Sequence, residues 1–157
     1  MIRGFTLIEV LIAAILVGMS IAALVVANGT LTMANGEGTN QSTAEFLAEQ
    51  IRELTALLPV VDPTTTTTTF GPEETNLAGY DDLDDFDGAA FSPPIGANRA
   101  VLSEFSGFTQ EVTVQNVNPS DLDLVVADHS TSFVQITVRV LMNNRPIVST
   151  SWIRAKF

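Results

Sequence analysis

Residues 5–27 read FTLIEVLIAAILVGMSIAALVVA, and this stretch decides the fold of the chain. Its apolar character is interrupted only at Thr6, Glu9, Gly18 and Ser20. A helix built from it is apolar on every side, and at about 1.5 Å per residue roughly 20 residues span the hydrocarbon core of a bilayer. We therefore expect a transmembrane helix over about residues 5–27.

Basic residues are placed asymmetrically around this apolar run. Arg3 and the initiator amine precede it, and the next basic residue is Arg52. Positive charge collects on the cytoplasmic side of membrane segments. The pattern predicts a single pass with the N-terminus in the cytoplasm and the remainder of the chain outside.

The composition of the 157 residues excludes several classes of function. There are 7 Lys and Arg against 18 Asp and Glu, which gives a formal net charge of −11. So acidic a chain does not neutralise phosphates, and we expect no nucleic-acid partner. The chain has no Cys, which removes disulfides, thiol catalysis and thiolate metal sites.

Glu9 is unusual because it lies inside the apolar run. A carboxylate in a membrane helix costs roughly 2.5–3.5 kcal/mol near the bilayer centre, and less toward an end. Such a group needs a partner and tends to be functional. A cleavable secretory signal and a plain single-pass anchor also produce apolar N-terminal runs, but neither accounts for Glu9.

The stretch around Glu9 resembles the class III signal of type IV prepilins and pseudopilins. The matching residues are Gly4 to Ala13, GFTLIEVLIA. The resemblance implies that a membrane aspartyl peptidase cuts between Gly4 and Phe5 and methylates the new N-terminus at Phe5. It also implies that Glu9, the fifth residue of the mature chain, acts in assembly by neutralising the N-terminus of a neighbouring subunit.

The resemblance gives a full set of expectations about the protein. We expect a structural subunit of a type IV pilus, with a pseudopilin of a type II secretion system as the alternative and a membrane-anchored calcium- or ligand-binding module as a third. The implied partners are other pilin or pseudopilin subunits, prepilin peptidase, the inner-membrane assembly platform and, before assembly, membrane lipid. The implied location is the bacterial inner membrane and then a pilus or a periplasmic pseudopilus.

The predicted domain organisation is a leader at residues 1–4, an N-terminal helix over 5–58 and a head over 59–157. Turn-forming residues at 28–29 and 35–40 predict a break or loosened turn in the helix. Ser42 and Glu45 have the spacing of a capping box, which predicts a helix start there. The residues that follow at helical spacing predict an apolar stripe; they are Leu47, Ile51, Leu54 and Leu58.

The head is predicted to be rich in β-structure. Residues 107–117 and 132–142 are dense in β-branched side chains, and residues 147–157 predict a last strand after a turn at Asn143-Asn144. An antiparallel sheet with one apolar face needs a cover, which the helix stripe supplies. The fold class is therefore α+β, with a long N-terminal helix packed on a C-terminal antiparallel sheet. The resemblance implies the same architecture, although the C-terminal disulfide loop of many major pilins cannot form here.

An acidic loop is predicted at residues 73–88, EETNLAGYDDLDDFDG, after a run of Thr64–Thr69 that predicts an exposed linker. The loop has two interpretations: a solvated acidic face, or a calcium site in which a hard cation offsets carboxylate repulsion. The speculative ligands are Asp81, Asp82, Asp84, Asp85 and Asp87. Their spacing does not fit an EF-hand. The segment YDDLDDFDG also resembles an acidic loop of some minor pilins of mannose-sensitive haemagglutinin-type pili, which favours a minor subunit.

The sequence favours a structural protein over an enzyme. His129 is the single His, and its neighbours Asp128 and Ser130 are adjacent in sequence, which rarely produces a catalytic triad. We expect His129 to lie on a surface loop. Motifs of phosphate-binding loops, zinc clusters and nucleophile elbows are missing from the sequence. No cofactor is expected apart from the speculative calcium.

Overall fold

The structure is a computed structural model that describes residues 4–61 and 69–156. Residues 1–3 of the predicted leader and most of the Thr64–Thr69 run lie outside the described residues. The chain forms two compact units, Met1–Asn40 and Gln41–Phe157, and each is described by itself. One helix, α1 (Leu7–Thr55), contributes residues to both units.

Helix α1 is continuous, so the predicted break at residues 28–29 and 35–40 is wrong. The Thr hydroxyls in this part donate to helix carbonyls one turn earlier: Thr32 to Asn28 at 2.9 Å and Thr39 to Asn35 at 3.0 Å. These bonds satisfy the polar side chains without leaving the helix, and helix propensity alone is a weak determinant.

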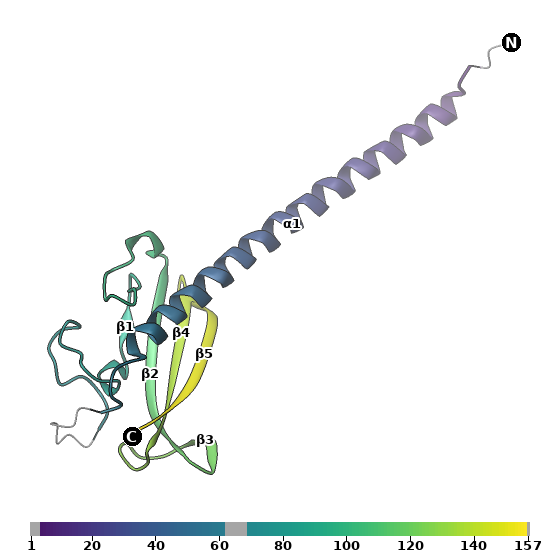
Figure 1. Cartoon of the computed structure of the whole chain (residues 1–157). Helices are drawn as coiled ribbons and strands as arrows, with labels where there is room; N and C mark the ends of the chain where they lie inside the picture. The colour runs from purple at the N-terminus through teal and green to yellow at the C-terminus, as the bar shows by residue number, and fades with distance from the viewer. Residues whose placement is uncertain (1–3, 62–68, 157) are drawn as a thin grey trace. The chain divides into compact units, whose positions relative to one another are not determined.

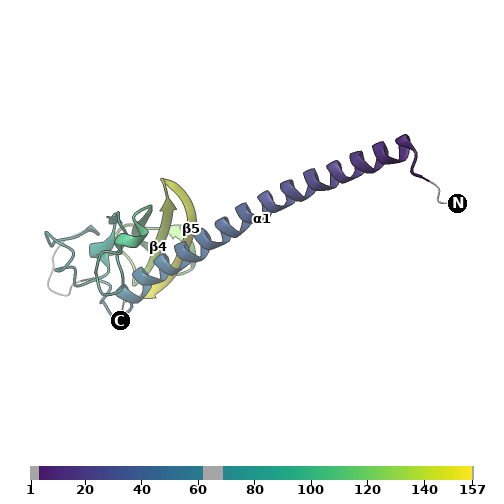
Figure 2. The same cartoon turned by 90° about the horizontal axis from the view of Figure 1, so that it is seen from above.

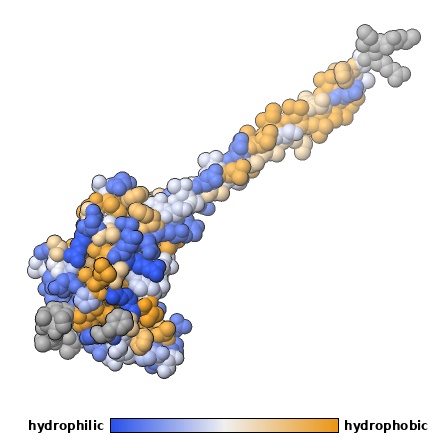
Figure 3. Space-filling model, in the orientation of Figure 1, coloured by the Kyte–Doolittle hydropathy of each residue, from blue (hydrophilic) through white to orange (hydrophobic). Residues whose placement is uncertain are grey.

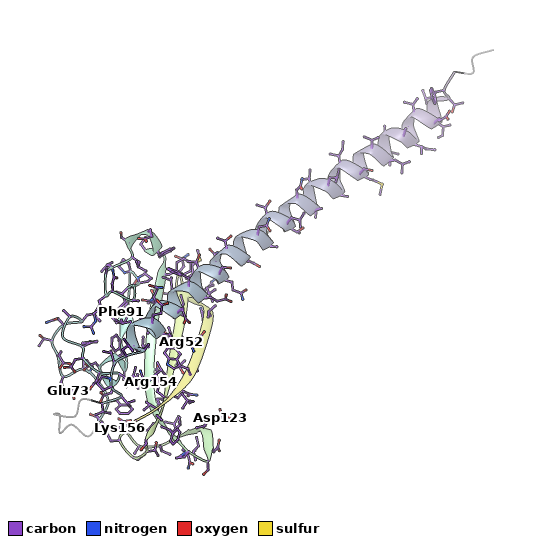
Figure 4. All side chains as sticks on the ribbon, in the orientation of Figure 1. Arg52, Glu73, Phe91, Asp123, Arg154 and Lys156 are labelled. Atoms are coloured by element: carbon purple, nitrogen blue, oxygen red, sulfur yellow. The ribbon has the colours of Figure 1, made fainter. Side chains whose placement is uncertain are left out.

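The predicted capping box at Ser42 and Glu45 is also wrong, because both residues lie inside α1. Glu45 instead accepts a hydrogen bond from the Gln41 side chain at 3.1 Å, one turn along the helix. The helix ends at Thr55 rather than at Leu58. Arg154 binds this end by donating to the carbonyls of Thr55 at 2.6 Å and Leu58 at 3.0 Å (Figure 4). A cation at a helix C-terminus is favoured by the helix dipole.

The second unit contains an antiparallel sheet with the order β1-β2-β4-β5, and β3 pairs with the far end of β2 (Figure 1). The bounds of the strands are β1 (Ala90–Phe91), β2 (Phe108–Asn118), β3 (Asp121–Val125), β4 (Phe133–Met142) and β5 (Arg145–Ala155). Two short 3₁₀ helices, η1 (Asp84–Phe86) and η2 (Ser103–Phe105), lie in the loops. The predicted strands at 107–117 and 132–142 are confirmed to within a residue.

The terminal hairpin is confirmed, with a tighter turn than predicted. Asn143 and Asn144 have φ values of 50° and 64°, the left-handed pair that a two-residue hairpin turn requires. β5 therefore begins at Arg145, two residues before the predicted start of the last strand at residue 147, and it includes Pro146. Pro is tolerated because β5 lies at the edge of this sheet.

The core of the second unit lies between the last turns of α1 and one face of the sheet (Figure 2). Leu47 and Ile51 of the predicted stripe are fully buried, and Leu54 and Leu58 are partly buried against the same core. The sheet contributes buried side chains from alternate positions; they are Val112, Val114, Val134, Ile136, Val138 and Val140. The predicted α+β architecture, a long N-terminal helix packed on a C-terminal antiparallel sheet, is confirmed.

One polar side chain, Gln110, lies inside this core and is fully hydrogen-bonded. Its amide donates to the carbonyls of Leu47 at 2.8 Å and Ile95 at 3.1 Å, and its oxygen accepts from the Ile95 N–H at 2.8 Å. Buried polar groups are tolerated when their bonds are made. Gln110 thus ties α1, β2 and the loop before η2 together.

The glycines of the middle of α1 provide a test of its continuity. A Cβ added at Gly36 or Gly38 meets no heavy atom within 4 Å. Gly costs about 0.5–1 kcal/mol relative to Ala in a helix interior, so Gly36→Ala and Gly38→Ala should slow amide exchange over residues 30–45 by hydrogen–deuterium exchange in a non-ionic detergent. Ala34→Gly is the reverse control and should speed exchange. Unchanged exchange in all three variants would contradict a continuous helix.

Candidate functional site

The N-terminal candidate site begins with residues 4–6, which are neither helix nor strand, and continues into α1. Gly4 is exposed, with open space around it, and the Phe5 side chain is 83% exposed. The predicted Gly4–Phe5 cleavage site thus lies in accessible, non-helical chain before the first helical residue, Leu7.

Thr6 and Glu9 form a capping box at the start of α1, which the sequence analysis missed. The Thr6 N–H donates to Glu9 Oε2 at 3.4 Å, and the Glu9 N–H donates to Thr6 Oγ1 at 3.3 Å. The T-x-x-E spacing could have revealed it, as the same pattern was considered at Ser42. Glu9 therefore has a local structural role in addition to any role in assembly.

The side chains that follow Glu9 form an exposed apolar surface (Figure 3). Leu11, Leu16 and Leu24 are all more than half exposed, and the apolar 18-residue window of α1 contains no buried residue. By length and composition this helix is able to cross a membrane. Because none of the window is buried, the segment is not the core helix of the unit that contains it.

The second candidate site is the acidic loop, and much of it is buried. Asp82, Asp84 and Asp85 expose at most 1% of their surface, while Asp81 is exposed. The expectation of a solvated face is therefore wrong for these three residues. Leu83 and Phe86, which flank Asp84 and Asp85 in the sequence, are core residues, so packing of these apolar side chains draws the neighbouring carboxyl groups inward.

Backbone amides satisfy some of the carboxylate oxygens. Asp85 Oδ2 accepts the N–H groups of Asp81 at 2.9 Å and Asp82 at 3.3 Å, and Asp82 Oδ1 accepts the Asp85 N–H at 3.1 Å. Asp87 accepts the N–H of Val114 at 2.7 Å and so fastens the loop to β2. Three of the five predicted ligands thus have local structural bonds.

Other carboxyl oxygens in the loop are buried without a hydrogen-bond donor. They are both oxygens of Asp84, Oδ1 of Asp85 and Oε2 of Glu74. The nearby cation Arg99 is directed elsewhere, since its guanidinium donates to the backbone carbonyls of Leu77, Ala78 and Tyr80. Asp84 faces Asp82, and Asp85 faces Glu74, in carboxyl–carboxyl pairs that make a hydrogen bond only when one member holds a proton.

This environment changes the acidity of two groups. Burial, followed by the hydrogen bond and the repulsion from Asp82, raises the pKa of Asp84 to about 9. Burial and the interaction with Glu74 raise the pKa of Asp85 to about 7, against the lowering effect of its amide donors. At neutral pH the loop therefore holds protons that an exposed acidic run would not.

Potential metal ligands come from two sets of three carboxylates among the described residues. Asp81, Asp82 and Asp85 form one set, and the other comprises Glu73, Glu74 and Asp85. In each set the three oxygens lie within 4.8 Å of one another. The sequence analysis listed the members of the first set and missed Glu73 and Glu74, which lie earlier in the same acidic segment.

His129 lies on a loop, in agreement with the prediction for it. Its φ is 57°, and its ring packs edge-on against Phe70 with centroids 4.9 Å apart. Asp128 accepts the Phe70 N–H at 3.1 Å instead of orienting the imidazole. These contacts join two loops of the second unit.

Comparisons with known proteins add no identification. The scan against family models matches no family, and the searches of curated proteins and of solved structures find no match. The function therefore has to be argued from the residues of the two candidate sites.

The raised pKa of Asp84 predicts an unusual pH dependence. In the folded state Asp84 keeps its proton up to about pH 9, while in the unfolded chain it loses it near pH 4, so this group destabilises the fold increasingly as pH rises between these values. Asp84→Asn cannot ionise. Its amide can still donate the hydrogen bond that a protonated Asp84 donates to Asp82. Its melting temperature, measured by circular dichroism in chelator, should exceed that of wild type by a margin that grows with pH.

The control for this prediction is Asp123→Asn, because Asp123 is exposed on β3. It should show no margin that grows with pH. A constant or shrinking difference between Asp84→Asn and wild type would show that Asp84 is ionised in the folded protein.

Proposed function

We propose that this protein is a structural subunit of a type IV pilus, held in the membrane by α1 before assembly and packed through the same helix afterwards. The observation that supports the proposal best is the exposed apolar surface of α1, with Glu9 as the single charged residue between Phe5 and Gly36. Removing apolar surface from water is favourable by roughly 25 cal/mol per Å², so exposure of this helix surface to water is unfavourable. This apolar surface can be buried in two ways, by membrane lipid or by the apolar helices of other subunits.

The charge of Glu9 gives this packing its selectivity. In the isolated chain its carboxylate accepts one long bond from the Thr6 N–H, at 3.4 Å and exposed to solvent. That bond leaves the negative charge uncompensated when the helix enters an apolar environment. Cleavage after Gly4 creates a cationic amine at Phe5, and the amine of a neighbouring copy is the partner that compensates the charge.

The proposal extends to processing, location and partners. Prepilin peptidase cuts and methylates the chain at Phe5, an inner-membrane assembly platform extracts it from lipid, and other subunits receive it. The second unit lies outside the cytoplasm. A pseudopilin of a type II secretion system would use the same helix, and the two are distinguished by which assembly machinery the chain requires.

The first test of the proposal is the position of the mature N-terminus. When the chain is expressed with an active prepilin peptidase, mass spectrometry should find a chain that begins at N-methylated Phe5. Replacement of Gly4 by a bulkier residue, as in Gly4→Val, should block cleavage because the peptidase needs a small residue at this position. A mature N-terminus near Asn28 would indicate a secretory signal instead.

The second test separates the charge of Glu9 from its capping role. Glu9→Gln keeps the capping-box acceptor for the Thr6 N–H but removes the charge, whereas Glu9→Ala removes both. Glu9→Gln leaves the Phe5 amine of the neighbouring copy unpaired. An unpaired charge costs roughly 2.5–3.5 kcal/mol near the bilayer centre and less toward the end of a helix, and about 1.4 kcal/mol corresponds to a factor of ten. Glu9→Gln should therefore lower incorporation into filaments by about tenfold or more, as measured by immunoblotting sheared filaments.

The two Glu9 variants discriminate between the possible outcomes. Membrane insertion and the circular dichroism of the second unit should stay at the wild-type level in both. Normal incorporation of Glu9→Gln, with loss only in Glu9→Ala, would assign Glu9 to helix capping and contradict the charge-pairing role.

A further inference from the structure

The carboxylate of Asp85 is divided between two different environments. Its Oδ2 accepts the two amides of Asp81 and Asp82, which fix the orientation of the side chain. Its Oδ1 is buried and has no hydrogen-bond donor. The side chain is 1% exposed, so bulk water is not the missing partner. Asp85 is also a member of the carboxylate set that it forms with Glu73 and Glu74.

A second unsatisfied oxygen belongs to Glu74. Its Oε2 is buried and has no donor, and oxygens of Glu73, Glu74 and Asp85 lie within 4.8 Å of one another. Oxygens that share one calcium at 2.3–2.6 Å are separated by at most about 5 Å. The three carboxylates therefore have the spacing of a single coordination shell.

The backbone holds Glu74 in this position. Gly79 approaches so closely that an added Cβ would lie 2.8 Å from Cγ and 3.0 Å from Cβ of Glu74. These are the inner atoms of the side chain, which cannot move aside without moving the carboxylate. Arg99 anchors the backbone that follows Glu74 by donating to the carbonyls of Leu77 and Ala78.

We propose that Glu73, Glu74 and Asp85 bind a calcium ion. The ligands are all oxygens, which hard cations prefer, and they come from a loop of irregular geometry, which calcium tolerates better than the strictly octahedral magnesium. We choose this set over the run of five Asp residues because one oxygen each of Asp82, Asp85 and Asp87 in that run already accepts a backbone amide. This site does not depend on the proposed function in filaments.

A single tyrosine makes the site observable. Tyr80 is the one Tyr of the chain, and its ring contacts Phe86, the neighbour of Asp85, edge-on at a centroid distance of 5.2 Å. Terbium occupies calcium sites and luminesces when a nearby aromatic ring is excited. The full chain in a non-ionic detergent should therefore show saturable terbium luminescence that calcium displaces, and that magnesium at the same concentration displaces much less.

Variants at the site should separate ligands from bystanders. Glu74→Gln and Asp85→Asn keep the size of each side chain and should weaken calcium binding, measured by calorimetry, about tenfold or more. Gly79→Ala displaces Glu74 without removing a carboxylate and should also weaken it. Tyr80→Phe should abolish the terbium signal but keep calcium binding. Asp123→Asn is the matched control on β3, away from Glu73 in Figure 4, and should bind as wild type does.

Each outcome supports or overturns the proposal. Calcium binding that is equal in wild type, Glu74→Gln and Gly79→Ala overturns it, as does the absence of calcium binding to the wild-type chain. Stabilisation that sodium chloride of matched ionic strength reproduces shows charge screening in place of a site. If Asp85→Asn fails to fold, Glu74→Gln remains decisive, because the Gln amide can still donate a hydrogen bond to the Asp85 carboxylate.

Discussion

The packing of Leu47 and Ile51 against the valine-rich face of β2 and β4 is the interaction on which the second unit depends. Both helix residues are fully buried, and burial of a large aliphatic side chain contributes about 1.5–3 kcal/mol. Without the helix, the sheet would expose one apolar face, and without the sheet the stripe would lie in water. Gln110 and Arg154 tie the two layers together by donating to helix carbonyls, Gln110 to that of Leu47 and Arg154 to that of Thr55, the last residue of α1.

The sequence predicts the parts of this fold that carry a strong periodic pattern. Alternating β-branched residues placed β2 and β4 correctly, and the helical spacing from Leu47 placed the core stripe. The predicted break near Gly29 is wrong. Gly and Asn have low helix propensity there, but the Thr side chains nearby donate hydrogen bonds to helix carbonyls, and propensity alone does not include these bonds. β1 is too short to leave a pattern, whereas β3, DLDLV, does alternate and could have been found.

The acidic loop shows where sequence reasoning stops. Charge density predicts solvation for each Asp separately, but burial is decided by Leu83 and Phe86, which lie among them and belong to the core. Once these two side chains pack, the intervening Asp84 and Asp85 have to follow at the spacing of a tight 3₁₀ turn. The cost of burying them is offset by protons or by a cation, since neither backbone amides nor Arg99 reach all of their oxygens. Whether a proton or a cation compensates these carboxyl groups depends on the distances between Glu73, Glu74 and Asp85, and these distances cannot be predicted from the sequence.

Glu9 also places a carboxyl group in an apolar environment, but its charge is not compensated in the same way as in the acidic loop. In the acidic loop the pKa values of Asp84 and Asp85 are raised, so a buried carboxyl group can keep its proton and donate it to a neighbouring carboxylate of the same chain. Glu9 has no second carboxyl group nearby in sequence, and Thr6 offers it only one long bond. Under the proposed function, the cut after Gly4 creates a cation at the end of the same apolar helix, and the amine of another copy compensates the charge of Glu9. Under the proposed function, the residue that caps its own helix in the isolated chain also selects a neighbour, because the capping bond uses one oxygen and leaves the charge in place.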